Sequence, residues 1–133
     1  MRCILLTACG IALVVAAFAQ GDADYQKWMK TVGATSASLR KNLDSKNAES
    51  ASADAKKLQD AFEQVHVYWQ KKNINDAMKF AMDAGTGFRE IGEQATAGKF
   101  EDAAATLKKA MTTCGGCHTA HREKAEDGSW KIK

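Results

Sequence analysis

The sequence predicts an all-α domain, folded as an antiparallel up-down-up-down bundle of four helices. Its 133 residues, a length typical of one domain, contain no proline, the residue that breaks helix interiors. Apolar residues recur at spacings of three and four along four segments, as they do on the buried faces of amphipathic helices. The breaks between these segments are only a few residues long, so successive helices should pack against one another.

The first residues, 1–19, predict a secretory signal peptide, which leaves a folded domain over residues 20–133. Arg2 gives the segment its positive start, an almost unbroken apolar run follows, and Ala-Phe-Ala at 17–19 is a small-x-small cleavage site. A membrane anchor is the alternative, although the run is shorter than the roughly 20 residues that span a bilayer. A lipoprotein signal ending at Cys9 would have too few apolar residues before that cysteine.

The first two helices are expected over residues 22–46 and, after a small polar loop at 47–52, up to residue 72. Each carries one apolar face at helical spacing. In the first helix, this face consists of Tyr25, Met29, Val32, Ser36, Leu39 and Leu43. In the second helix, it consists of Ala55, Leu58, Phe62, Val65 and Trp69.

The third helix is expected to begin at Asp76 with Asn75 as its cap, and to end at a glycine stop formed by Ala97 and Gly98. It is rich in alanine and glycine, and such small residues let neighbouring helices approach closely or leave space for a group that is not a side chain. Its apolar face consists of Ala77, Ala81, Ala84, Phe88, Ile91 and Ala95.

The fourth helix is expected to begin near Phe100 and to end at a break formed by Asp127 and Gly128. Glu101 and Asp102 lie in its first turn, where negative charge suits the helix dipole. Its buried face is expected to contain Ala103, Leu107, Ala110, Cys114, Cys117, His118 and His121. No strand is expected. The four helices offer few large apolar side chains, so a large apolar cofactor would complete the core.

Residues 114–118 read Cys-Gly-Gly-Cys-His, the attachment motif of a c-type haem. Each thiol of such a pair adds to one vinyl group of the porphyrin. Positions i, i+3 and i+4 of a helix share one face, so Cys114 and Cys117 would hold the ring edge while His118 turns its imidazole toward the iron. Covalent attachment takes place outside the cytoplasm, which agrees with the predicted signal peptide.

The cysteines also allow other interpretations. Four cysteines could form two disulfides, but cleavage of the signal would remove Cys3 and Cys9 and leave one pair three residues apart. A thioredoxin-like pair belongs near a βαβ pattern rather than late in a helical chain. A zinc site with His118 or His121 would need a tetrahedral cage, which consecutive turns of one helix rarely provide.

Two further segments carry a family resemblance. Residues 97–102 read Ala-Gly-Lys-Phe-Glu-Asp, and the haem histidine is followed by Thr-Ala-His-Arg at 119–122. Both segments are similar to the class II c-type cytochromes, whose haem site lies near the C-terminus of a four-helix bundle. The resemblance implies one covalent haem c, export to a bacterial periplasm, and a place for Arg122 near the haem. His121 stands where that family usually has an aromatic residue.

The sixth iron ligand divides that family into two functions. Residues 29–33 read Met-Lys-Thr-Val-Gly, similar to the Met-Lys-x-x-Gly stretch of the electron-carrying members. The resemblance therefore implies Met29 as the distal iron ligand opposite His118. Met29 could instead be an ordinary core residue, as methionine fills gaps well. His66, at the edge of the second helix's apolar face, is a weaker candidate.

These observations lead to two functional hypotheses. In the first, a six-coordinate haem carries electrons between periplasmic redox partner proteins, and the chain is not an enzyme. In the second, the iron is five-coordinate, as in cytochrome c prime, and binds nitric oxide or carbon monoxide. The formal net charge of +3 is too small to indicate nucleic acid as a partner.

Other expectations concern the surface. No membrane span is expected after processing, and a homodimer is implied by the resemblance only. Basic pairs on the predicted helices could dock an acidic redox partner, or they could simply be solvated. Only its position in the sequence indicates that Trp130 covers the haem edge.

Overall fold

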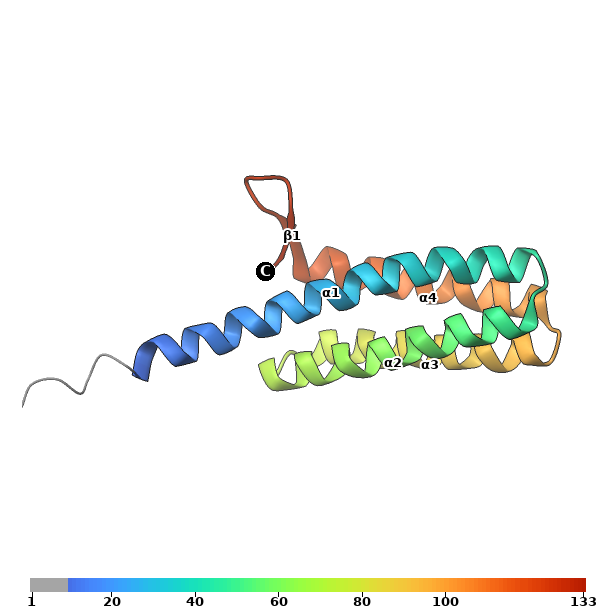
Figure 1. Ribbon diagram of the computed structural model, residues 1–133, viewed down its shortest axis with the longest axis horizontal. Helices are drawn as coiled ribbons and strands as arrows, with labels where there is room; N and C mark the ends of the chain where they lie inside the picture. The colour runs from blue at the N-terminus through green and yellow to red at the C-terminus, as the bar shows by residue number, and fades with distance from the viewer. Residues whose placement is uncertain (1–9) are drawn as a thin grey trace, which may run out of the picture.

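The computed structural model describes the backbone of residues 10–133 and the side chains of residues 21–133. Within this part, the chain forms four helices and a small two-stranded sheet that follows them (Figure 1). The elements are α1 (Gly10–Asp44), α2 (Ala48–Lys72), α3 (Asn75–Thr96), α4 (Phe100–His121), β1 (Arg122–Lys124) and β2 (Trp130–Ile132). The expectation of four helices is confirmed. The hairpin formed by β1 and β2 was not expected.

The predicted signal peptide falls partly outside the described residues, which exclude residues 1–9. In the uncleaved chain, α1 begins at Gly10 and not at residue 22, the expected start. The sequence upstream of residue 22 contains no proline and is rich in alanine, so it can continue a helix. Cleavage after residue 19 stays a prediction.

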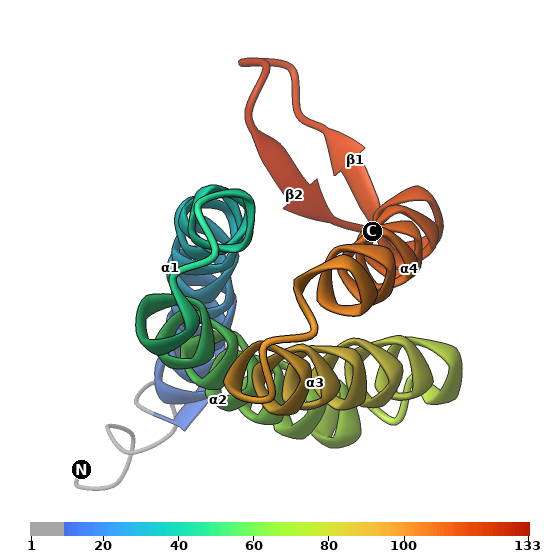
Figure 2. The ribbon, with the colours of Figure 1, turned by 90° about the vertical axis from the view of Figure 1, so that its right-hand side faces the viewer.

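The helices do not contact one another equally. Extensive contacts join α2 to α3, α3 to α4, and α1 to α2, whereas α1 and α4 scarcely touch. In the end-on view of Figure 2, α1 and α4 stand on opposite sides above α2 and α3. The bundle is therefore least closed between α1 and α4, the two helices that carry the predicted site residues.

The core confirms most of the predicted apolar faces. Every predicted position on α2 and α3 is buried, as are Val32 and Leu39 of α1. Phe62 of α2 and Phe88 of α3 stack at the centre of the bundle, with ring centroids 5.5 Å apart. On α4 the prediction holds only in part, because burial stops at Ala110.

Small residues let α3 approach its neighbours closely. A Cβ atom built on Gly87 would lie 3.3 Å from the Cβ of Ala110 on α4. One built on Gly92 would lie 3.4 Å from the Cβ of Ala55 on α2. Close helix approach thus accounts for part of the alanine and glycine content of α3.

The predicted loop at 47–52 is wrong. α2 begins at Ala48, and Asn47 is its N-cap, with Oδ1 accepting a hydrogen bond of 3.0 Å from the backbone N–H of Ser50. Small polar residues are compatible with the first turns of a helix once a cap satisfies the free N–H groups. At the next turn, the expected Asn75 cap is also wrong by one residue, because Ile74 holds that position.

The end of α4 differs most from expectation. The helix ends at His121, and β1 and β2 then pair antiparallel, with Arg122 opposite Ile132. The turn between the strands follows local chemistry: Asp127 Oδ1 accepts the backbone N–H of Ser129, and Gly128 has a φ of +80°. Glycine adopts this left-handed conformation without strain. The glycine stop after α3 is confirmed, since Gly98 has a φ of +73°.

Among the described residues, no helix is both long enough and apolar enough to cross a membrane.

Candidate haem-binding site

A cavity of about 370 Å³ opens between α1 and α4, with α2 and α3 forming its floor. We call it the bundle cavity. Its walls are mainly apolar, and the predicted site residues Met29, Cys114, Cys117, His118 and Arg122 all line it. Further lining residues are Tyr25, Val32, Gly33, Ser36, Ala37, Arg40, Phe62, Val65, Phe80, Ala81, Ala84, Met111 and Thr113.

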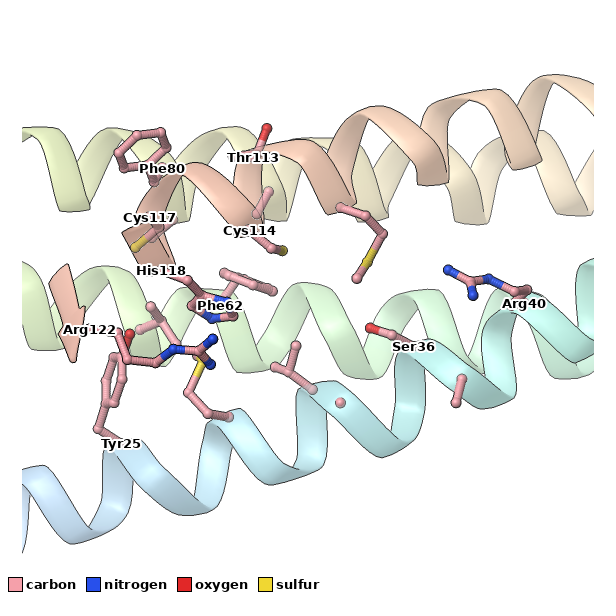
Figure 3. A pocket seen from close by; sticks show the side chains of 18 residues that line it. Tyr25, Ser36, Arg40, Phe62, Phe80, Thr113, Cys114, Cys117, His118 and Arg122 are labelled. Atoms are coloured by element: carbon pink, nitrogen blue, oxygen red, sulfur yellow. The ribbon is translucent and has the colours of Figure 1, made fainter. Parts of the chain in front are cut away.

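Two consecutive turns of α4 present the motif to this cavity. In Figure 3, Cys114 and His118 point from α4 toward α1. Cys117 also lines the cavity, and neither cysteine forms a disulfide. Gly116 lies against α3, where a Cβ atom would stand 3.0 Å from Cε1 of Phe80, so a larger residue would crowd this turn.

Both thiols have raised pKa values. Burial raises the pKa of Cys114, and burial together with the nearby Cys114 and Asp76 raises the pKa of Cys117 to about 11. The two side chains are therefore protonated at neutral pH. A thioredoxin-like pair needs the opposite, because its attacking thiol has a lowered pKa.

The histidine of the motif is held in its neutral form. Burial lowers the pKa of His118, and the positive charge of Arg122 lowers it further. A neutral imidazole has the nitrogen lone pair that iron requires. Within the described chain, no three His, Cys, Asp or Glu side chains converge on a metal-sized site, so the zinc alternative has no cage here.

Met29 lies on the opposite wall. It projects from α1, is half-buried against the core, and lines the same cavity as His118. The two predicted iron ligands thus belong to the two helices that scarcely touch each other. Whether Met29 ligates iron stays a prediction.

Arg122 lies at the end of α4, where the hairpin begins. Its guanidinium carbon stands 3.8 Å from the ring centroid of Trp130, a cation–π contact across β1 and β2. Its Nε atom is buried and has no hydrogen-bond partner among the described residues. Ser36 Oγ, on α1, is a second buried polar atom without a partner.

A second cavity, of about 510 Å³, lies between α1, the end of α4 and the hairpin. We call it the hairpin cavity. It shares Tyr25, Met29, Cys117, His118 and Arg122 with the bundle cavity. Its other lining residues are Gln26, Lys30, His121, Ser129, Trp130, Lys131 and Ile132. This cavity depends on the hairpin, which the sequence did not predict.

Tyr25 belongs to an aromatic cluster behind the shared part of the two cavities. Its ring centroid lies 4.5 Å from that of Tyr68 and 5.5 Å from that of Trp69. Burial raises the pKa of Tyr25 well above its ordinary value, so the hydroxyl stays neutral. The sequence indicated Tyr25 only as a core residue.

The other two histidines lie elsewhere. His121 packs on Trp69, with 5.2 Å between ring centroids, and its Nε2 stands 2.9 Å from Oδ2 of Asp76 on α3. It lines the hairpin cavity but not the bundle cavity. His66 lines a separate groove on the outer side of α2 and α3, together with Val67 and Met82.

The site fits a porphyrin. Its walls are apolar, as the ring requires, and two buried polar atoms lack partners that a bound group would provide. The inward face of α4 becomes half-exposed from Cys114 onward, where the motif begins. An apolar group in the cavity would complete the core at this end.

Comparison with protein families, curated proteins and solved structures found no match to this chain.

Proposed function

We propose that this chain is a class II c-type cytochrome, an exported electron carrier with one covalent haem c in an antiparallel up-down-up-down bundle. One observation carries the proposal. The cysteines and the histidine of the Cys-Gly-Gly-Cys-His motif line a cavity whose opposite wall presents Met29. This is the arrangement needed to hold a porphyrin by its edge and to approach its metal from two sides.

Each residue has a distinct part in this proposal. Cys114 and Cys117 form the thioether bonds, for which both thiols must be free, as they are here. With haem bound, His118 would offer the iron a neutral imidazole nitrogen and Met29 would offer it a thioether sulfur. Bound haem supplies the Fe(II)/Fe(III) couple. Val32 and Phe62 line the cavity with apolar groups that exclude water, and burial of this kind tunes the reduction potential of a bound haem.

The chain carries out no substrate conversion in this account. Its partners are redox proteins in the periplasm, reached after cleavage of the signal peptide. Basic pairs such as Lys108-Lys109, which is exposed, suit an acidic partner surface. Homodimerisation rests on the family resemblance alone.

A second function is favoured by the character of the wall around Met29. Val32 and Gly33, which follow Met29 on α1, and Phe62 of α2 line the same cavity without a polar side chain. Such a wall suits an uncharged diatomic gas at a five-coordinate iron, with Met29 as a steric lid. In that case the protein binds nitric oxide or carbon monoxide, as cytochrome c prime does.

The visible spectrum of the purified haem protein separates the two functions. Methionine ligation predicts a low-spin reduced spectrum with sharp, split bands and a sulfur-to-iron charge-transfer band on oxidation. Met29→Ala should convert this spectrum to high spin. Met82→Ala is the matched control, because Met82 is 57% exposed and lies outside the cavity. A high-spin spectrum of the unaltered protein would favour the gas-binding function instead.

A further inference from the structure

The hairpin cavity differs in chemistry from the bundle cavity. Its lining includes the cations Lys30, Arg122 and Lys131, and it includes no carboxylate. Lys131 is already paired with Glu123 on the neighbouring strand, at 3.2 Å. Lys30 and Arg122 make no ion pair with any described residue. Both could therefore pair with a bound anion.

The hairpin is anchored over the cavity from both sides. Gln26 Nε2, on α1, donates a hydrogen bond of 3.4 Å to the backbone oxygen of Trp130. Across the sheet, the Trp130 ring covers the guanidinium of Arg122, and the Lys133 ammonium donates to the backbone oxygen of Thr119 at 3.0 Å. Trp130 therefore positions Arg122, whose buried Nε has no partner among the described residues.

We propose that the hairpin cavity receives the two propionate carboxylates of the covalently attached porphyrin, paired with Lys30 and Arg122. This proposal rests on the haem function proposed above. A porphyrin is amphipathic, with an apolar vinyl edge and a dianionic propionate edge. Both cysteines line the apolar bundle cavity, whereas only Cys117 also lines the cationic one. Two carboxylates match two unpaired cations: Arg122, whose buried Nε has no partner among the described residues, and Lys30, which is exposed.

One other place could receive the carboxylates. Arg40 lines the bundle cavity at its far end, near Ser36 (Figure 3). Arg40 and Lys30 are both exposed, so exposure does not separate the two places, but only the hairpin cavity combines Lys30 and Arg122 with the polar side chains of Gln26 and Ser129. The hairpin cavity is therefore the better match.

Resonance Raman spectroscopy of the haem protein tests this proposal, because the propionate bending bands respond to hydrogen bonds and ion pairs. We expect Lys30→Gln to shift one of these bands. Trp130→Leu should shift the band of the propionate paired with Arg122, since it removes the surface that positions the guanidinium. Both changes should also lower the reduction potential, because cations near the haem stabilise the ferrous state.

Arg40→Gln tests the competing place at the far end of the bundle cavity and should leave the propionate bands unchanged. Bands that shift with Arg40→Gln and not with Lys30→Gln or Trp130→Leu would overturn the proposal. A free carboxylic acid could also pair with these cations, so the spectra are repeated with acetate added at constant ionic strength. We expect the propionate bands to stay unchanged. A shift that depends on acetate would show that the cavity binds a free carboxylate instead.

The failure of this proposal is distinguishable from that of the haem function. A protein with attached haem and unchanged propionate bands in both variants would refute the carboxylate site alone. A protein exported without covalent haem would refute both.

Discussion

His121 and Asp76 join the last residue of α4 to the first turn of α3, with 2.9 Å between Nε2 and Oδ2. The same Asp76 carboxylate, through Oδ1, accepts the backbone N–H of Ala77 at 2.9 Å. One side chain in the first turn of α3 therefore accepts a backbone amide of that turn and contacts the end of α4 that carries the Cys-Gly-Gly-Cys-His motif. This contact holds the end of α4 close to α3, whereas α1 and α4 scarcely touch.

Replacing this carboxylate should destabilise the protein in a pH-dependent way. Desolvation tends to raise the pKa of Asp76, but the hydrogen bonds from His121 and the Ala77 amide outweigh it, and the pKa falls below its ordinary 3.8. The stabilisation is therefore present above about pH 4 and is lost as the pH falls through the lowered pKa. Asp76→Asn should lower the thermal midpoint at pH 7 and have a vanishing effect in strong acid.

Asp102→Asn is the matched control for this experiment. Asp102 lies in the first turn of α4, so it shares the helix-dipole interaction of Asp76 without a histidine partner. If Asp102→Asn lowers the thermal midpoint as much as Asp76→Asn does, the helix dipole rather than the His121 contact accounts for the stabilisation.

Enlarging Gly87 should force α3 and α4 apart. The nearest atom to its missing side chain is the Cβ of Ala110, at 3.3 Å, which cannot move without its helix. Gly87→Leu should therefore reduce the free energy of unfolding by about 1–3 kcal/mol, a typical cost of overpacking. The neighbouring Thr86 is exposed, so Thr86→Leu should change the free energy of unfolding by no more than about 0.5 kcal/mol. Urea unfolding measures both, and equal effects would contradict the close contact.

The thiol of Cys117 should react slowly in the folded chain without haem. Its pKa of about 11, against an ordinary 9.0, reduces the thiolate population at pH 8 by about 100-fold. Alkylation by iodoacetamide in the folded, haem-free chain should be slower than in the urea-unfolded chain by a comparable factor. The rate should rise with pH until about pH 11. Equal rates in the two states would contradict the burial of this thiol.

The helical fold could be predicted in detail because its evidence is periodic. Each predicted apolar position of α3, from Ala77 to Ala95, is buried. The ends of the helices were harder to predict, because a single capping side chain can decide whether a polar segment is helix or loop. Residues 47–52 look like a loop by composition, and only the cap formed by Asn47 with the Ser50 amide makes most of them helical.

The part of the site that belongs to the Cys-Gly-Gly-Cys-His motif could be predicted from the sequence. Cys114, Cys117 and His118 share one helical face by spacing alone, and they line one cavity. The hairpin was not predictable in this way, because strands of three residues have no usable period. The convergence of Lys30 with Trp130 depends on how α1 packs against that hairpin, and no local pattern encodes it.

The intact mass of the exported protein tests whether Cys114 and Cys117 hold one haem. The chain should be produced with its signal peptide in cells that mature c-type cytochromes, and then purified under denaturing conditions. The measured mass should be that of residues 20–133 plus one haem, with neither thiol open to alkylation. Cys114→Ser combined with Cys117→Ser should give the chain mass alone. The wild-type chain without haem, with its thiols free or joined in a disulfide, would contradict the account.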